Sequence, residues 1–136
     1  MKFSHVGPAI ISVAVLSCAT PTENELPAVE LLTDRTTYVV GDSAVLTVTN
    51  RSANSIVYLL CTLGIERKAG TIWEPVYRGA VGCIEGDSRE LARFESEEWR
   101  LQVPTSAGEY RFRVTVFPPR GQQSFVVSSN PFTVEN

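Results

Sequence analysis

Apolar and polar residues alternate along several short segments of this chain. The clearest case is residues 110–116, in which apolar side chains take every second position and Arg111 and Arg113 fall between them. Residues 44–50, introduced by Gly41 and Asp42, and residues 97–103 alternate in the same way. Because successive side chains of a strand point to opposite faces, this pattern predicts β-strands with one face buried.

Other segments add further strands. Residues 56–63 form a mostly apolar run, which predicts a strand buried on both faces. Residues 65–67 and 71–77 flank Lys68-Ala69-Gly70, a hairpin loop by composition. Residues 125–128 and 132–134 supply the last strands, whereas residues 88–94 offer at most one turn of helix.

About seven to nine short strands without a convincing helix predict an all-β fold, an antiparallel β-sandwich. The alternation also predicts which side chains fill the space between the sheets. Arg111 and Arg113 should point to solvent. The predicted core residues are Leu46, Val48, Trp99, Leu101, Val103, Tyr110, Phe112, Val114 and Val116.

The N-terminus has the features of a leader. Residues 6–16, behind Lys2, are mostly apolar but too short to span a bilayer, which takes about 20 apolar residues. The run Val15-Leu16-Ser17-Cys18 resembles a bacterial lipoprotein signal, in which the cysteine becomes the lipidated first residue of the mature protein. This resemblance implies a signal peptide at 1–17, a lipidated, flexible tether at 18–27 and one domain at 28–136.

Two other interpretations of the leader stay open. The residues Ser17-Cys18-Ala19 also fit an ordinary signal cleavage site after Ala19. A buried core helix is disfavoured by Gly7 and Pro8 near its start. With either form of leader the domain is exported, and the lipoprotein form anchors it to a membrane of the cell envelope, the outer membrane if the cell has one.

Two more cysteines, Cys61 and Cys83, lie within the domain. In an exported chain an isolated pair of cysteines predicts a disulfide. A metal-binding or redox pair is the alternative, but the spacing is not C-x-x-C. The only histidine of the chain, His5, lies in the leader.

Three stretches resemble the bacterial immunoglobulin-like domains of small exported lipoproteins. They are residues 38–50, residues 65–73 and residues 107–112, followed by the C-terminal residues 130–134. More distantly, the chain resembles the immunoglobulin-like intracellular proteinase inhibitors. The resemblance implies an immunoglobulin-like sandwich. Independently of it, Tyr110 follows a glycine closely at the start of a strand, where a tyrosine corner is expected, and Gly41 and Gly108 suit turns that require positive φ.

The composition argues against catalysis. Without a histidine outside the leader, the domain has no Ser-His-Asp triad, no Cys-His pair and no histidine metal site, so we expect neither an enzyme nor a cofactor. The two acidic clusters, one around Glu85, Asp87 and Glu90 and one around Glu95, predict solvated loops. They lack the pattern of an EF-hand. Asn50-Arg51-Ser52 matches the glycosylation pattern, but we interpret Asn50 as a turn residue.

Trp73 and Tyr77 are the candidate binding residues. They share one face of their strand, and Ile72 and Val76 share the other. If Ile72 and Val76 point inward, the two aromatic residues form an exposed pair suited to contact with protein or carbohydrate. If Trp73 points inward, it belongs to the core.

The sequence therefore predicts a non-catalytic, membrane-tethered protein-interaction module whose partner is an envelope protein or a glycan. The Arg and Lys residues are scattered, so no nucleic-acid partner is expected. One alternative is a protease inhibitor that presents the loop 79–90, held by Cys83. Another is a structural envelope protein without a specific ligand. The pattern sets no oligomeric state.

Overall fold

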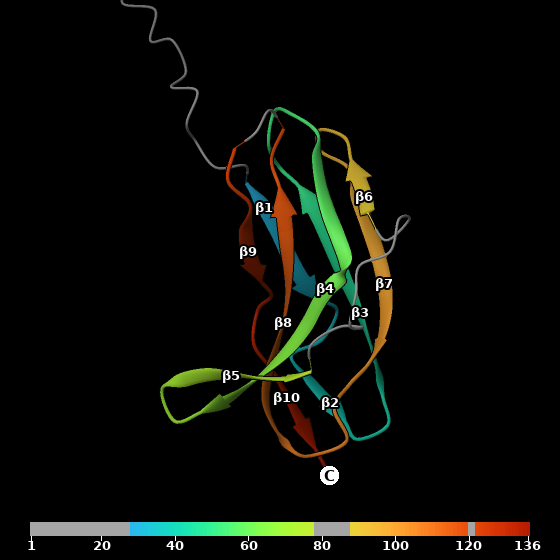
Figure 1. Cartoon of the computed structure of the whole chain (residues 1–136). Helices are drawn as coiled ribbons and strands as arrows, with labels where there is room; N and C mark the ends of the chain where they lie inside the picture. The colour runs from blue at the N-terminus through green and yellow to red at the C-terminus, as the bar shows by residue number, and fades with distance from the viewer. Residues whose placement is uncertain (1–27, 78–87, 120–121) are drawn as a thin grey trace, which may run out of the picture.

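The computed structural model describes residues 28–77, 88–119 and 122–136, and these fold as a sandwich of two β-sheets (Figure 1). The small sheet has the order β1-β3-β7. The large sheet has the order β2-β10-β8-β4-β5, with β6 paired to β4 and β9 paired to β8. The strands are β1 (Val29–Thr33), β2 (Thr37–Val39), β3 (Ser43–Asn50), β4 (Ile56–Ala69), β5 (Ile72–Tyr77), β6 (Ser88–Leu91), β7 (Ser96–Gln102), β8 (Gly108–Phe117), β9 (Phe125–Ser128) and β10 (Phe132–Glu135).

The predicted all-β, immunoglobulin-like sandwich is confirmed. The described residues form ten strands rather than seven to nine, because β1, β2 and β6 were not predicted as strands, while the predicted segments 56–63 and 65–67 form the single strand β4. Residues 88–91, for which we expected at most a helical turn, pair with β4 as β6. All pairings are antiparallel except that of β2 with β10, which is parallel. No helix in the described part of the chain is long and apolar enough to cross a membrane.

The core confirms most of the predicted inward-facing residues. Seven of the nine are buried, whereas Trp99 and Leu101 are half-buried and pack against the edge of the core. Both lie on β7, which pairs with β3 on one side only within the described residues, so their side chains are covered less completely. The run 56–63 is buried on one face only: Ile56 and Tyr58 are buried and the residues between and after them are half-buried.

Aromatic rings form the centre of the core between β2, β8 and β10. The ring of Phe132 stacks on Phe112 at 5.1 Å and on Tyr110 at 6.1 Å, and Tyr38 meets it edge-on at 5.4 Å. These are the offset and edge-to-face arrangements that aromatic pairs favour. The Tyr110 hydroxyl donates to the Ser106 carbonyl at 2.9 Å, so the predicted tyrosine corner is confirmed.

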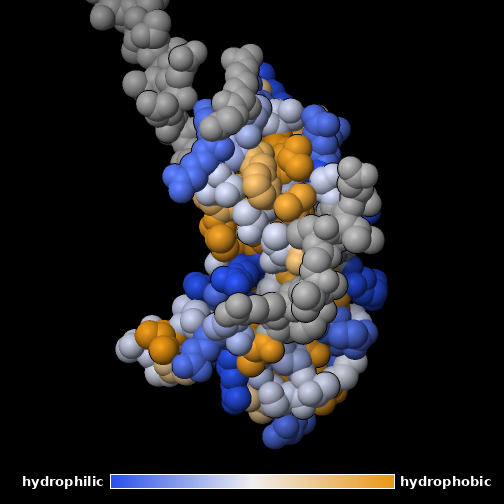
Figure 2. Space-filling model, viewed as in Figure 1, coloured by the Kyte–Doolittle hydropathy of each residue, from blue (hydrophilic) through white to orange (hydrophobic). Residues whose placement is uncertain are grey.

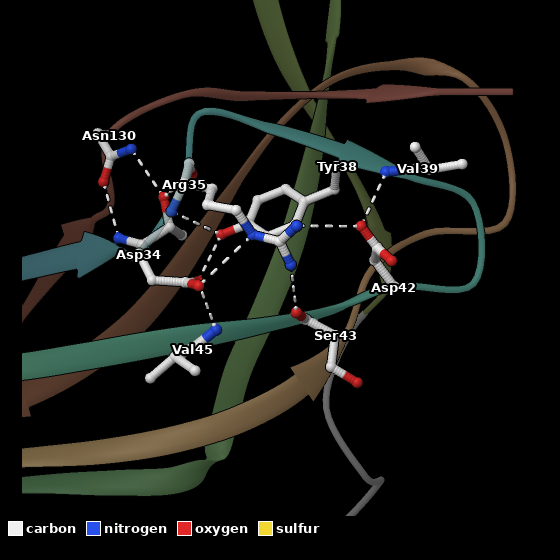
Figure 3. A network of polar contacts seen from close by, with 9 residues as sticks. Asp34, Arg35, Tyr38, Val39, Asp42, Ser43, Val45 and Asn130 are labelled. Carbon is white, nitrogen blue, oxygen red and sulfur yellow. Dashed lines mark hydrogen bonds and ion pairs between the residues drawn. The ribbon is translucent and has the colours of Figure 1, made fainter.

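A polar network ties the turn before β2 to the start of β3 (Figure 3). Asp34 Oδ1 accepts hydrogen bonds from the Tyr38 hydroxyl at 2.8 Å and from the Val45 backbone N–H at 2.7 Å. Desolvation by itself would raise the pKa of Asp34, but these hydrogen bonds, together with the charge of Arg35, hold that pKa below its ordinary value. Gly41, with φ of +96°, lets the chain turn between Val39 and Asp42, as predicted.

Candidate functional site

The most distinctive feature of the molecule is a projecting hairpin. β4 continues past the body of the sandwich and returns as β5, so that the hairpin extends to one side of the molecule (Figure 1). Gly70, with φ of +63°, and Thr71 form its turn, which confirms the hairpin predicted around residues 68–70. A left-handed residue suits a tight turn between antiparallel strands, and glycine adopts this conformation without steric cost. We call residues 65–77 the β4–β5 hairpin.

The hairpin changes the interpretation of Trp73. Trp73 is half-buried and lies outside the hydrophobic core, while Ile72 and Val76 on the opposite face are 57% and 54% exposed. Our premise that one parity of β5 faces the core is therefore wrong. The physical reason is that the hairpin leaves the sandwich, so that no second sheet of the described part of the chain covers either of its faces. The side chain of Tyr77 lies outside the described residues, and a binding role for Trp73 and Tyr77 stays a prediction.

Trp73 packs against cations on the outer face of the large sheet. The guanidinium of Arg111 lies 4.5 Å from the centre of the indole ring, and the ammonium of Lys68 lies 5.9 Å from it. Cations over an aromatic face are attracted by its negative charge density. Lys68 also pairs with Glu109 at 3.1 Å. These contacts join β4, β5 and β8 at the base of the hairpin.

Next to the cations that pack on Trp73, the side chain of Glu66 is buried between two arginines. Its carboxylate pairs with Arg111 Nε at 2.6 Å and with Arg113 NH1 at 3.2 Å. Both arginines lie on the outer face, as predicted, but they are half-buried rather than directed freely to solvent. On the face seen in Figure 2, hydrophobic residues gather above a hydrophilic area that lies next to the projecting hairpin. Exposed Phe117 and Val126 lie on the same outer face.

The inner face of the hairpin forms one wall of an apolar groove of about 540 Å³. This groove separates the hairpin from the edge of the small sheet. It is lined by Leu63 and Ile65 of β4, Val76 of β5, Leu101 and Gln102 of β7, Val103, Pro104, Thr105 and Ser106 after β7, and Tyr110 and Phe112 of β8. Most of these side chains are aliphatic or aromatic, and polar groups are confined to Gln102, Thr105, Ser106 and the Tyr110 hydroxyl.

The position of the groove follows from the two unequal sheets. Among the described residues the small sheet ends at β7, whereas the large sheet continues beyond β4 into β5. Arg67 of β4 connects the hairpin to the segment before β8, because its guanidinium donates a hydrogen bond to the Ala107 carbonyl at 3.0 Å. Gly108 allows this close approach, because a Cβ there would lie 2.9 Å from Arg67 Nε. The groove thus opens toward Tyr110 and Phe112, which are otherwise buried in the core.

A second network fixes the strand on the other side of the groove. The Trp99 indole N–H donates to the Tyr58 hydroxyl at 2.8 Å, and that hydroxyl donates to the Glu97 carboxylate. Burial and the hydrogen bond to Glu97 raise the pKa of Tyr58 well above its ordinary value, so the hydroxyl keeps its proton and this bond in more alkaline solution than an exposed tyrosine would. β7 of the small sheet is therefore held to β4 of the large sheet by polar contacts as well as by packing.

The other predicted residues fall in different places. Cys18 and Cys83 lie outside the described residues, so lipidation and the Cys61–Cys83 disulfide stay predictions; Cys61 itself is half-buried on β4. Of the acidic clusters, residues 85 and 87 also lie outside, while Glu95 accepts a hydrogen bond from the Ala92 N–H. Among the described residues no group of three or more His, Cys, Asp or Glu side chains could hold a metal ion.

The groove was not predictable from the pattern of single strands. The sequence pattern placed Leu63, Ile65 and Val76 in or next to strands without a binding role. It indicated no role for residues 104–106. The unusual length of the β-forming run from Ile56 to Ala69 was the available signal, because a strand much longer than its neighbours must extend past them. The arrangement can bind an apolar segment by desolvation and can bind a strand at its flanking edges; it contains no set of groups for acid-base or nucleophilic catalysis.

Comparison with known proteins supports the fold. No family model matches the chain, and no curated protein matches it. Among solved structures, a chain of the Salmonella enterica SafA pilin in complex with the SafB chaperone is similar, with a TM-score of 0.51 and 15% identity over 81% of this chain. The match spans about half of that solved chain, 55%. At this identity the similarity shows the fold alone.

Two further matches are weaker. The ASH / PapD-like domain of human CEP192 gives a TM-score of 0.37 at 12% identity, covering 88% of this chain and 96% of that one. A β-glucosidase from Erythrobacter marinus gives a TM-score of 0.38 at 12% identity, covering 80% of this chain and 16% of the enzyme.

Proposed function

We propose that this domain is a non-catalytic, extracytoplasmic protein-interaction module that binds an apolar segment of a partner protein in the groove under the β4–β5 hairpin. The observation that carries the proposal is the groove itself. It exposes an aliphatic lining beside buried aromatic residues, and water at such a surface is displaced favourably by apolar side chains. Ile65, Val76 and Leu101 are its most direct contacts for a ligand.

The edges of the groove favour an extended ligand. β5 and β7 each end their sheet among the described residues, so each offers backbone donors and acceptors on one side. A peptide strand that pairs with such an edge places alternate side chains toward the groove. Affinity would then come from main-chain hydrogen bonds, and selectivity from the apolar side chains that enter.

The location of the groove suits a tethered protein. β1 begins at the end of the sandwich opposite to the hairpin and the C-terminus (Figure 1). If Cys18 carries lipid, residues 18–27 would attach the domain to the membrane at the β1 end. The groove would then be presented away from the membrane, toward other components of the envelope. Multiple acyl chains on one cysteine, typical of bacterial lipoproteins, give stable anchoring.

The groove can be tested with a pair of matched variants. Selection from a random peptide library displayed on phage should enrich peptides with alternating apolar residues. Val76→Asp should weaken the binding of a selected peptide by about tenfold or more, because a carboxylate in the apolar lining must be desolvated when the ligand enters. The dissociation constant of each variant, measured by fluorescence anisotropy, gives this ratio.

Ile72→Asp is the control, since Ile72 is as exposed as Val76 on the same strand but does not line the groove. It should bind the peptide as the unchanged protein does. Both substitutions are on exposed positions, so neither should alter the melting temperature appreciably. Equal loss of affinity in both variants, or no enrichment of peptides at all, would contradict the proposal.

The membrane tether is tested separately. In its own cells the unchanged protein should sediment with the membrane fraction, and Cys18→Ser should move it to the soluble envelope fraction. Metabolic labelling with a fatty acid that carries a clickable alkyne should mark the unchanged protein and leave the variant unmarked. A labelled Cys18→Ser protein, or an unchanged protein that is soluble and unlabelled, would exclude lipidation at this residue.

The protease-inhibitor alternative depends on a loop whose residues 79–87 lie outside the described residues. No contact of the described part of the chain favours it over the groove. The interaction module is therefore the function that the geometry supports best.

A further inference from the structure

The free side of β7 has a regular arrangement of backbone groups. Two hydrogen bonds at the ends of β7 show which of its residues form hydrogen-bonded pairs with β3. The Asn50 N–H donates to the Glu95 carbonyl, and the Val103 N–H donates to the Asp42 carbonyl. Hydrogen-bonded and non-hydrogen-bonded pairs alternate along an antiparallel ladder. The odd-numbered residues of β7 therefore bond to β3, and the N–H and C=O groups of Ser96, Glu98, Arg100 and Gln102 point away from it.

No strand of the described residues pairs with this side of β7. The same even-numbered residues have exposed side chains, which lie on the outer face of the small sheet. Within the described residues, neither Glu98 nor Arg100 has an ion-pair or hydrogen-bond partner for its side chain. The edge thus combines available backbone groups with two unpaired charges of opposite sign.

The sequence of β7 is complementary to itself. Consider two copies of one strand, paired antiparallel about a two-fold axis normal to the sheet. Opposite residues of such a pair lie on the same face of the sheet. The axis must therefore pass between a residue and the same residue of the other copy, and this residue is the centre of the pairing. Trp99 is the middle residue of Ser96–Gln102, so a pairing centred on it overlaps the whole strand. In this register Glu98 of each copy is opposite Arg100 of the other, and Ser96 is opposite Gln102.

The neighbouring registers are worse. A shift of the centre to Glu98 places Glu98 opposite its own copy, and a shift to Arg100 does the same with two arginines. Like charges directly opposite each other destabilise a pair of strands, and opposite charges stabilise it. Both shifts also shorten the overlap. Charge and length therefore select one register.

The inner face fits the same pairing. The two Trp99 rings would be opposite each other at the centre, in a non-hydrogen-bonded pair, where side chains approach most closely. Glu97 would be opposite Leu101, but the Glu97 carboxylate accepts the hydrogen bond of Tyr58 and is directed into its own chain. The Tyr58–Trp99 hydrogen bond fixes β7 in place, so little order has to be gained on pairing.

We propose that a second copy of this chain binds at β7, forming a two-fold symmetric dimer in which the small sheets join edge to edge through antiparallel β7 strands centred on Trp99. The dimer uses the backbone and the outer-face charges of β7, whereas the apolar lining of the groove comes from side chains of the inner face. A partner peptide that pairs with the free edge of β7 would compete with this dimer, whereas a peptide that pairs with β5 would leave the β7 edge available.

A charge-swap experiment tests this dimer. Sedimentation velocity of the full chain, in detergent where it carries lipid, should show a concentration-dependent dimer between about 1 and 100 µM. Glu98→Arg and Arg100→Glu should each raise the dimer dissociation constant by about tenfold or more, because each creates two like-charge contacts across the axis. The double variant Glu98→Arg/Arg100→Glu restores opposite charges and should restore the dimer to within about threefold of the unchanged protein.

The three variants change exposed residues of one strand and should retain the far-ultraviolet circular dichroism spectrum of the unchanged protein, which checks folding. Four outcomes would overturn the proposal. They are a chain that is monomeric throughout this range, a dimer unaffected by both single reversals, a dimer that only one of the two single reversals weakens, and a double variant as weak as the single ones.

Discussion

Replacing Phe132 with alanine should lower the free energy of unfolding by about 4 kcal/mol, a large part of the stability of a domain of this size. Phe132 is 1% exposed and its ring contacts those of Tyr38, Tyr110 and Phe112. The substitution removes the buried ring with its packing contacts. It leaves a cavity, because the three neighbouring rings are rigid and cannot move in to fill it. Urea denaturation followed by tryptophan fluorescence gives the change.

The control for this prediction is Phe94→Ala. Phe94 is 62% exposed and has a positive φ of 62°. This conformation is strained for phenylalanine and for alanine alike, so the substitution leaves the backbone strain unchanged. Its replacement should change the free energy of unfolding by less than about 0.5 kcal/mol. A Phe132→Ala variant as stable as Phe94→Ala would show that the aromatic cluster is not the centre of the core.

Replacing Asn50 with leucine should cost about 3 kcal/mol, the second largest effect we expect. Asn50 is completely buried at the end of β3, and its amide donates to the carbonyls of Asn54, Leu91 and Ala92 at 2.8 to 3.1 Å. Its Oδ1 accepts from the Ser52 N–H at 3.0 Å. Leucine has a similar volume but no polar atoms, so buried carbonyl groups would lose their donor.

The matched control is Asn54→Ala, because the exposed side chain of Asn54 has no such role and only its backbone carbonyl is used. We expect a change within about 0.5 kcal/mol, measured by the same urea titration. Equal stability of the two variants would mean that the Asn50 amide does not hold the loop. Asn50, which we interpreted as a turn residue, is instead the last residue of β3, and its side chain bonds to the loop that follows. Its amide is buried in the folded domain and therefore inaccessible to glycosylation.

The sequence was sufficient for the class of fold because alternation is a local property. In residues 110–116 the side chains that alternate in the sequence alternate between core and outer face in the structure. The glycines at 41 and 70 and the tyrosine at 110 likewise act within a few residues of themselves: each turn or corner closes over a short stretch of chain. Such features depend on backbone geometry that the neighbouring residues already define.

The candidate site was not predictable in the same way. The groove joins residues of β4, β5, β7 and β8 that lie far apart in the chain, and it exists because one sheet extends further than the other. Parity alone suggested that one face of β5 must enter the core, yet both faces lie outside it. Arg111 and Arg113 were correctly placed on the outer face, but their partner Glu66 is 45 residues from Arg111 and could not be paired with it from the pattern.

By itself, the sequence determined that this is a sandwich of short strands, where its turns lie and which side of most strands faces inward. It also determined that the described domain has no histidine with which to build common catalytic sites. Only the tertiary structure decided what each face meets: the cations against Trp73, the carbonyls around Asn50, the groove under the hairpin and the free edge of β7. The physical reason is that the direction of a side chain is set by its own backbone. Its surroundings depend on which distant strands pair with each other and on where one strand extends beyond its neighbour.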